Sequence, residues 1–465
     1  MRFAAYPKYK PSGVEWLGDV PEHWDVKRGR FCMDVNPGSP RMRTLRSDDE
    51  VSFVPMEAVG EYGGLELGQT RAIADVGSGY TEFEDGDVVV AKITPCFENG
   101  KGALATGLLN GAAFGTTELH VLRSDPILER RFLFYFSISR LFRSIGEGEM
   151  YGAGGQKRVP PEFCENVRLP LPPIDDQFAI ADFLDRATAK IGALVAKKRM
   201  LIERLKEKRT ALISRTVTRG LPPDAARAAG LDPHPKLKPS GIDWLGDVPE
   251  HWRVTRLMYV TDQARPIMYG IVLPGPDVDD GVPIVKGGDV KPGRLSLEKL
   301  CRTTPEIEAG YVRSRLKASD LVFSIRGTVG EAELVPEEIA GANLTQDAAR
   351  IAPGATANSR WLLYTAKAKA IIDPLLSLSL GAAVRGVNIR DLKRTVVLLP
   401  PADAQQVIAE WLDTQTSLID EMERKVETAI KRLQEYRTAL ITAAVTGKID
   451  VRGLSGADAA GTMTV

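Results

Sequence analysis

Histidine and cysteine are both scarce in this sequence, with only four residues of each among 465. No two cysteines form a Cys-x-x-Cys pair and their spacings are unrelated, so we expect neither a disulfide framework nor a zinc site. Two of the histidines lie inside a repeated motif, which leaves too few for a histidine-based metal cluster. The expected reduced thiols are those of Cys32, Cys96, Cys164 and Cys301.

Long apolar runs and an excess of one charge are also missing. Lys and Arg together number 61, as do Asp and Glu. No apolar stretch approaches the roughly 20 residues of a membrane span, and the residues after Met1 lack the apolar core of a signal peptide. We therefore expect a cytoplasmic protein. A chain of 465 residues is long enough for two or three domains.

Motifs for catalysis are absent as well. No Pro-Pro pair has the preceding Asn or Asp and the following aromatic residue with which an amino-methyltransferase holds a flipped base. Gly447-Lys448 is followed by isoleucine, not by the Ser or Thr of a phosphate-binding loop. Asp87 and Lys92 flank an apolar stretch, as in a nuclease core, but the Glu-x-Lys ending is missing. The sequence predicts a chain without its own catalytic site.

The sequence does contain a duplication. Lys10–Trp24 returns as Lys238–Trp252, 228 residues later, with thirteen of fifteen positions identical and two conservative exchanges. We call each copy a leader. Arg209–Ile213 returns unchanged as Arg437–Ile441 at the same offset, so one repeat covers nearly the whole chain. We expect the tryptophans of each leader to anchor it by burial.

Each repeat ends in a long helix-forming stretch behind a pair of prolines. Proline is favoured just before a helix and cannot continue one, and an acidic first turn suits the helix dipole. Apolar residues then recur at steps of three and four, the spacing of a helix–helix seam. Because a long helix needs packing in water, we predict that the two stretches pair as a coiled coil within the chain. The predicted seam residues are Ile191, Leu194, Leu201, Leu205, Leu212, Ile419, Met422, Val426, Leu433 and Leu440.

Between leader and helix, each repeat holds a globule whose sequence has diverged. The first is rich in glycine, with β-branched runs such as Val88–Ile93 behind turn-forming residues. The counterpart Lys317–Arg326 is offset by 233 residues, so insertions and deletions have accumulated. Each globule also has one helix-like stretch, Pro126–Ile145 and Ser359–Leu376. We predict a mixed α/β or β-rich fold shared by both globules.

Charge is divided unevenly between the two helical stretches. Arg186–Arg219 contains eleven Lys or Arg against two Glu, whereas the matching span Thr414–Gly447 contains five against five acidic residues. A basic helix in a neutral chain predicts a track for a polyanion. The alternative is that these lysines only solvate an exposed helix face.

The order of these elements resembles the specificity subunit of type I restriction–modification systems. A leader ending in Pro-x-x-Trp, a variable domain, a proline pair and a long helix occur twice, from about Tyr6 to Val451. The resemblance implies two target recognition domains, each for one half of a split DNA sequence. It also implies an antiparallel helix pair that fixes their spacing. The implied fold is mixed α/β, with two similar globules separated by that pair and related by an internal pseudo-twofold repeat.

Short segments match this family at two places. Asp176–Gln177 and Ala404–Gln405 stand where the family commonly has Glu-Gln after the proline run, and Ala404 departs from that pattern. Gly154–Lys157 resembles the stretch of glycine and glutamine that ends a recognition domain. The second repeat has Gly381–Arg385 at that place, without the glutamine.

DNA recognition requires Arg, Lys, Asn and Gln side chains on well-supported loops, some for base edges and others for phosphates. Such residues follow one apolar run and one glycine run in each repeat. For each residue alone, the alternative is a solvated surface side chain. The candidates are Lys92, Thr94, Asn99, Lys101, Gln156, Lys157 and Arg158 in the first repeat, and Lys286, Arg326, Thr328, Arg385 and Asn388 in the second.

The leading interpretation is a non-catalytic subunit that binds double-stranded DNA. The family resemblance implies two methyltransferase (modification) subunits and restriction/translocase subunits as partners. S-adenosylmethionine, ATP and Mg would then belong to those partners, and this chain would bind no cofactor or metal itself. The alternative is a two-headed coiled-coil scaffold that binds proteins. A self-sufficient enzyme is disfavoured by the missing motifs.

The predicted domain boundaries follow from the repeat. The leader and first recognition domain occupy 1–168, and the first spacer helix region 169–219. After a linker at 220–235, the second leader and recognition domain span 236–396 and the second helix region 397–452. The small, polar tail at 453–465 is expected to be disordered.

Overall fold

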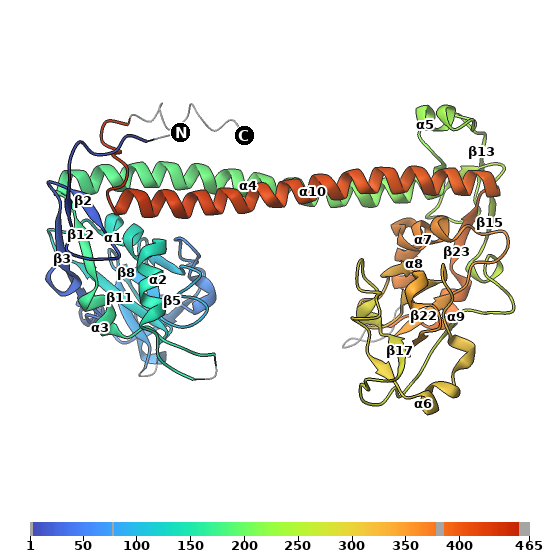
Figure 1. Cartoon of the computed structure of the whole chain (residues 1–465), viewed down its shortest axis with the longest axis horizontal. Helices are drawn as coiled ribbons and strands as arrows, with labels where there is room; N and C mark the ends of the chain where they lie inside the picture. The colour runs from blue at the N-terminus through green and yellow to red at the C-terminus, as the bar shows by residue number, and fades with distance from the viewer. Residues whose placement is uncertain (1–2, 77–78, 154, 378–385, 455–465) are drawn as a thin grey trace. The chain divides into compact units, whose positions relative to one another are not determined.

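The computed structural model of the chain describes residues 3–76, 79–153, 155–377 and 386–454 (Figure 1). The chain forms two compact units, Met1–Lys198 with Glu427–Val465, and Arg199–Val426. Each unit contains one leader, one globule and a part of each long helix. The boundaries predicted from the repeat set each long helix apart, whereas the compact units divide both helices.

Two four-stranded sheets form the globule of the first unit (Figure 1, blue to teal). Their strand orders are β6-β5-β10-β7 and β4-β11-β8-β9, and only β5 and β10 pair in parallel. The β-branched run at Val88–Ile93 gives the strand β8, all of whose residues are buried. The strands are β4 (Met33–Val35), β5 (Glu50–Val54), β6 (Thr70–Ala72), β7 (Thr81–Glu84), β8 (Val88–Ala91), β9 (Gly102–Leu104), β10 (Ala112–Gly115) and β11 (Leu119–Ser124).

The helix-like stretch of the first globule becomes two helices, α1 (Arg130–Ser137) and α2 (Arg140–Gly148). The break lies at Ser139, whose side chain accepts a hydrogen bond from Phe142 N and so caps the second helix. Aromatic residues of both helices pack in one buried cluster with β8. The chain continues with α3 (Pro161–Asn166) and β12 (Arg168–Leu171), and β12 pairs with β3 (Asp25–Arg28).

The second globule repeats this topology. Its strand orders are β16-β22-β19-β20 and β18-β17-β21, and β17 pairs with β21 in parallel as β5 does with β10. The prediction of a similar mixed fold in both repeats is confirmed. The strands are β15 (Arg253–Arg256), β16 (Met268–Tyr269), β17 (Val282–Val285), β18 (Arg302–Thr303), β19 (Leu321–Ser324), β20 (Ala332–Leu334), β21 (Asn343–Leu344), β22 (Ala348–Ile351) and β23 (Val396–Leu399). The helices are α5 (Pro223–Ala228), α6 (Pro305–Ala309), α7 (Ser359–Lys367), α8 (Lys369–Ser377) and α9 (Ile389–Arg394).

Each proline pair leads into a long helix, α4 (Ile174–Arg219) or α10 (Ala402–Val445). In each unit, early turns of one helix share a buried cluster with late turns of the other, so the two helices pair antiparallel. In the first unit the cluster includes Ile191 and Val195 of α4 with Leu440 and Ile441 of α10. In the second unit it includes Ile213 and Val217 of α4 with Ile408 and Leu412 of α10.

The seam of this pair differs from the predicted one at alternate positions. Leu201 and Met422 are 44% and 50% exposed, so they do not belong to the seam. The half-buried Ile202 takes the place of Leu201, because the inward positions 191, 195, 198, 202 and 205 alternate steps of four and three, beginning with a step of four. Of the other predicted seam residues, Ile191, Leu205, Ile419 and Leu440 are buried, and Leu194, Leu212, Val426 and Leu433 are half-buried.

Each leader is a short antiparallel hairpin followed by a buried tryptophan. Trp24 and Trp252 are 0% and 3% exposed. Trp244 corrects the expectation of burial, since it lies in the loop that connects the two strands and is 56% exposed. The hairpins are β1 (Tyr9–Pro11) with β2 (Asp19–Pro21) and β13 (Leu237–Pro239) with β14 (Asp247–Pro249).

Each leader also receives the C-terminal end of a long helix. Beyond α10, the Tyr9 hydroxyl donates to Gly447 O at 3.0 Å. Gly447 has a φ of +71°, and a Cβ there would lie 2.4 Å from Pro21, so the turn requires glycine. Beyond α4, Gly220 (φ +84°) lies against Trp252 in the second leader. The first leader therefore packs on the helix of the second repeat, and the second leader packs on the helix of the first.

Candidate nucleic-acid interface

A buried glutamine at the start of each long helix fixes the globule to that helix. The Gln177 side chain accepts from Glu129 N (2.7 Å) and donates to Ile127 O (2.9 Å) and Pro172 O (2.8 Å). It is fully buried. These bonds satisfy three backbone groups that would otherwise be buried without partners. The first turn of α4 is thereby joined to the turn before α1.

Gln405 makes the same three bonds in the second unit. It accepts from Asn358 N (2.8 Å) and donates to Thr356 O and Pro400 O (both 2.9 Å). The preceding Ala404 contributes none of these bonds, so its departure from the family pattern leaves the contact intact. The sequence marked both glutamines as family matches but did not reveal their structural role.

A tyrosine from α1 in the first globule, and one from α7 in the second, adds a second joint to the long helix. The Tyr135 hydroxyl donates to Asp185 Oδ1 (2.7 Å) and lies 3.2 Å from Thr188 Oγ1. The Tyr364 hydroxyl meets Asp413 (2.5 Å) and Thr416 (3.1 Å) in the same way. Burial raises the pKa of both phenols above the usual value, so they stay protonated as donors.

Two loops of the first globule meet at the end of β8. Val159 N donates to Lys92 O (2.8 Å), and Thr94 N donates to Lys157 O (3.0 Å), so the loop at 151–158 lies along the exit of the strand. Rigid support of this kind is what a recognition loop needs. The candidates brought together here are Lys92, Thr94, Gln156, Lys157 and Arg158.

Some of these side chains are occupied within the protein. Arg158 forms a two-pronged ion pair with Glu118, through Nε to Oε2 (2.9 Å) and Nη2 to Oε1 (2.8 Å). The hydrogen bond to Arg158 holds the pKa of Glu118 below its usual range. The Thr94 hydroxyl donates to Lys157 O at 3.2 Å. Arg158 and Thr94 therefore support the loop in this structure.

Lys101 is also occupied, because its Nζ donates to Met56 O at 2.9 Å. Asn99, Gln156 and Lys157 are exposed, and Lys92 is half-buried. The structure gives these four side chains no hydrogen-bond or ion-pair partner among the described residues. They are the candidates of the first globule that remain available to a ligand.

In the second globule, a strand end and a loop that lies along it meet in the same way but carry other side chains. We call this meeting of strand end and loop the juncture of each globule. Val387 N donates to Ile325 O at 2.9 Å, the counterpart of the bond between Val159 and Lys92. Arg326 follows directly, is exposed, and bridges to Gly386. A shared backbone arrangement with different side chains is what two recognition domains of different specificity require.

Two further candidates of this globule lie beside Arg326. The Thr328 hydroxyl donates to Gly287 O at 2.9 Å, which joins its loop to the turn that begins at Lys286. The Lys286 ammonium donates to Cys301 Sγ at 3.1 Å, and this contact raises the pKa of the lysine. Lys286 is exposed, so this weak acceptor leaves its remaining N–H groups facing solvent.

The last two candidates differ in what the structure shows. Asn388 is the N-cap of α9, and its side chain accepts from Arg390 N at 2.8 Å. This bond gives Asn388 a structural role that its sequence context did not reveal. Arg385 lies outside the described residues.

The described residues contain no group of three or more His, Cys, Asp or Glu side chains that could hold a metal ion. None of the described helices combines the length and apolar character needed to cross a membrane.

Parts of this chain are similar to proteins of a known family. Residues 279–432 match the sequence model of the family described as "Type I restriction modification DNA specificity domain". This part of the chain is therefore similar to a type I restriction specificity domain. The match runs from just before β17 through most of α10, and so takes in a large part of the second globule and most of the long helix that follows it.

Named specificity subunits are similar to this chain over different shares of their length. The type I restriction enzyme EcoAI specificity subunit of Escherichia coli is 39% identical over 161 residues, 34% of this chain and 27% of that protein. The EcoBI specificity subunit is 26% identical over 298 residues, 63% of this chain and 60% of that protein. The chain thus spans less than two thirds of each of these relatives. The MjaVIII specificity subunit of Methanocaldococcus jannaschii is 23% identical over 94% of this chain and 95% of that protein.

Two solved structures share the fold of this chain. A chain from the structure of complex assembly and conformational transition of the type I R-M system has a TM-score of 0.64 at 20% identity. The HsdS subunit from Thermoanaerobacter tengcongensis has a TM-score of 0.50 at 19% identity. Each match covers 92% of this chain and 98% of the other. The resemblance and the fold class stated from the sequence are confirmed.

Proposed function

We propose that this chain is the DNA-recognition subunit of a type I restriction–modification enzyme. Each globule contacts one half of a split target, and the paired helices set the spacer between the halves. The observation that carries this proposal is the pair of matching junctures, at the ends of β8 and β19. One frame holds Lys92, Gln156 and Lys157 in the first globule and Lys286 and Arg326 in the second.

Recognition is assigned to this chain and chemistry to its partners. The relatives are named specificity subunits of restriction enzymes. We infer that two modification subunits supply methylation with S-adenosylmethionine, and that restriction/translocase subunits supply ATP- and Mg-dependent cleavage. Several large apolar side chains of the long helices are exposed, which gives such partners a surface to bind. These are Met200, Leu201, Leu418, Met422 and Tyr436.

The test uses the chain in complex with its modification subunits and measures affinity for duplex DNA as salt is raised. If phosphates are neutralised, the logarithm of the affinity falls linearly with that of the salt concentration. Lys157→Gln should lower the slope by about 1 if Lys157 contacts a phosphate. Lys8→Gln, which changes an exposed lysine just before the first leader, is the control and should leave the slope unchanged. Affinity that does not depend on salt would favour the scaffold that binds proteins.

A further inference from the structure

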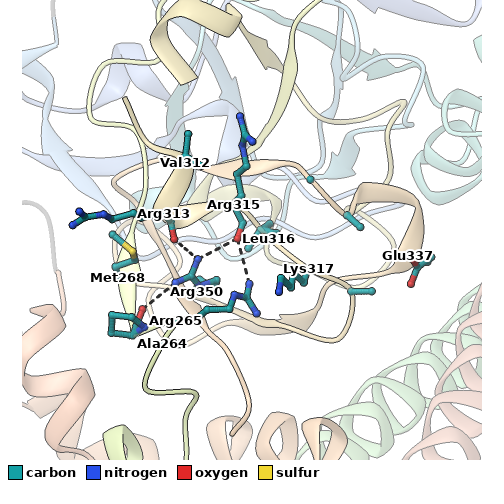
Figure 2. Close-up of a pocket in the computed structure, with 14 residues that line it drawn as sticks. Ala264, Arg265, Met268, Val312, Arg313, Arg315, Leu316, Lys317, Glu337 and Arg350 are labelled. Carbon is teal, nitrogen blue, oxygen red and sulfur yellow. Dashed lines mark hydrogen bonds between the residues drawn. The ribbon is translucent and has the colours of Figure 1, made fainter. Parts of the chain in front are cut away.

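An open hollow of about 930 Å³ lies in the second globule, away from the juncture at the end of β19 (Figure 2). It is bounded by the segment before β16, by the 3-10 turn Val312–Ser314 with the residues that follow it, and by β22. Cations dominate the charged lining. The charged residues that line it are Arg265, Arg313, Arg315, Lys317, Arg350 and the single carboxylate Glu337.

Two of these cations are neutralised by carboxylates that do not themselves line the hollow. Arg265 Nη1 donates to Asp320 Oδ1 at 2.8 Å and Nη2 to Oδ2 at 2.5 Å. Arg315 Nε and Nη2 donate to the Glu308 carboxylate at 2.6 and 2.5 Å. Such paired arginines stabilise the wall and leave little charge for a ligand.

Arg350 is different, because it is buried and forms no hydrogen bond or ion pair with a carboxylate among the described residues. Its side chain is 1% exposed, and its guanidinium donates to carbonyl oxygens of Arg313, Arg315 (3.1 Å) and Pro266 (3.2 Å). Nε has no hydrogen-bond partner among the described residues. Carbonyl oxygens satisfy N–H groups but do not neutralise the charge, and a buried unpaired charge is costly. Burial, and then the nearby Arg265, lower the pKa of Arg350, while the carboxylates of Asp320 and Asp262 act in the opposite direction and do not offset them.

The shared fold does not require this arginine. Arg350 of β22 stands opposite Val322 of β19. At the same place in the first globule, Val121 of β11 stands opposite Val89 of β8. Both valines are fully buried and apolar. An apolar residue therefore serves the frame in one globule, and the buried charge is particular to the other.

Two exposed cations flank Arg350 in the hollow. Arg313 and Lys317 lie on opposite sides of it in Figure 2. The structure gives neither side chain a hydrogen-bond or ion-pair partner among the described residues. Together with Arg350 they make three cations without a carboxylate partner around one hollow. Guanidinium and ammonium groups are the side chains that bind phosphate oxygens in proteins.

We propose that this hollow binds a phosphate group, with Arg313 and Lys317 in contact and Arg350 as a buried charge beneath it. The phosphate can belong to a free phosphate or nucleotide, or to the DNA backbone. Only the second source rests on the proposed function of the chain. In either case the bound anion compensates the charge of Arg350.

The test compares Arg313→Gln/Lys317→Gln with a control pair of equal charge, Arg253→Gln/Lys291→Gln. The control residues are exposed and lie in the same globule outside the hollow. Calorimetric titration with pyrophosphate should give saturable binding to the unaltered chain and to the control. Binding to the first variant should be weaker by about tenfold or more, because contacts to a charged group are lost. Equal affinity in all three proteins, or no binding to any, would overturn the proposal.

A second arm identifies the source of the phosphate. The salt slope for duplex DNA is measured on the same proteins in complex with modification subunits. A slope that falls by about 2 only in the hollow variant assigns the site to backbone phosphates. An unchanged slope with weakened pyrophosphate binding assigns it to a free anion. A chain that binds pyrophosphate but no DNA would refute the proposed function and leave the phosphate site standing.

Arg350→Met tests the buried charge itself. The variant should still fold, because the first globule has valine at this place, and circular dichroism checks that it does. Its pyrophosphate affinity should fall while Arg313 and Lys317 remain in place. If the folded variant keeps full affinity, Arg350 serves only to fasten the three carbonyl groups, and the assigned role of its charge is wrong.

Discussion

Single buried polar side chains connect the variable globules to the constant helices. Gln177 and Gln405 each satisfy three backbone groups, which belong to the turn before α1 or α7 and to the proline segment. The globules differ in sequence, yet these contacts involve the backbone of the turn and not its side chains. A globule can therefore change its surface while its attachment to the helix is kept.

Gln405→Leu should destabilise the second unit by roughly 2–4 kcal/mol, because three backbone groups lose their partner in a dry site. The neighbouring Gln406 is exposed and makes a side-chain bond only to Glu410. Gln406→Leu is therefore the matched control, with an expected change within about 0.5 kcal/mol. Urea unfolding of the two variants measures the difference. Equal midpoints would contradict the role given to Gln405.

The ionisation of Glu308 should make the stability of the second globule depend on pH. Its carboxylate is 1% exposed and accepts hydrogen bonds from Arg315 and Asn343. The bond to Arg315 holds the pKa of Glu308 below its ordinary value of 4.5. The carboxylate then contributes stability that is fully present above 4.5 and is lost as the pH falls through the folded-state pKa.

Urea unfolding from about pH 6 downward tests this dependence. The difference in stability between the unaltered chain and Glu308→Gln should shrink as the pH falls below 4.5. Glu338→Gln, an exposed carboxylate of the same globule, is the control and should follow the unaltered chain. A difference that stays constant through this window would show that the Glu308 carboxylate does not contribute in this way.

Residue type and neighbourhood predicted where polar side chains would gather, but not what each would do. Lys157 and Arg326 are exposed at the junctures, as the sequence suggested. Arg158 and Lys101 are bound to Glu118 and Met56, which lie 40 and 45 residues away along the chain. Contacts at such separation depend on strand pairing, and the local sequence does not encode them.

At the scale of elements, the helix pair was predictable in kind and direction but not in its facing residues. Proline pairs, acidic first turns and apolar spacing gave both helices, and the family resemblance gave their antiparallel direction. The predicted pattern alternated steps of three and four and began with a step of three, which selected Leu201 and Met422, both of them exposed. The ion pair between Arg209 and Asp420 shows the face that the helices share in the second unit. Because steps of three and four diverge by only part of a turn, apolarity alone did not choose between them.

The helix pair should act as a ruler for the DNA spacer. Seven helix-forming residues inserted after Val195 in α4 and seven after Gln434 in α10 add one heptad to each helix and keep the seam in phase. Each helix lengthens by about 10 Å, which corresponds to about three base pairs. Methylation mapping should show a longer spacer between unchanged half-targets. An active variant with the original spacer would show that another element sets the distance.

At the scale of the whole molecule, the repeat predicted the two globules but not the division of the helices. The offset of 228 residues gave two copies of leader, globule and helix. In the structure each leader packs on the helix end of the other repeat, so a compact unit draws on both repeats. Sheet order was also beyond the sequence, since β5 pairs with β10 across about sixty residues and both strands are short.

The central claim is that each globule recognises one half of the target independently. Residues 25–168 contain the divergent part of the first unit, while Gln177 and the long helices lie outside this span. A chimera that takes this span from another specificity subunit should therefore keep its attachment to α4.

Methylation mapping of DNA from cells that carry this chimera with its modification subunits reads both half-targets and the spacer in one experiment. One half-target should change to that of the donor, and the other half-target and the spacer should stay as they were. A folded, active chimera in which both half-targets change together would contradict the account.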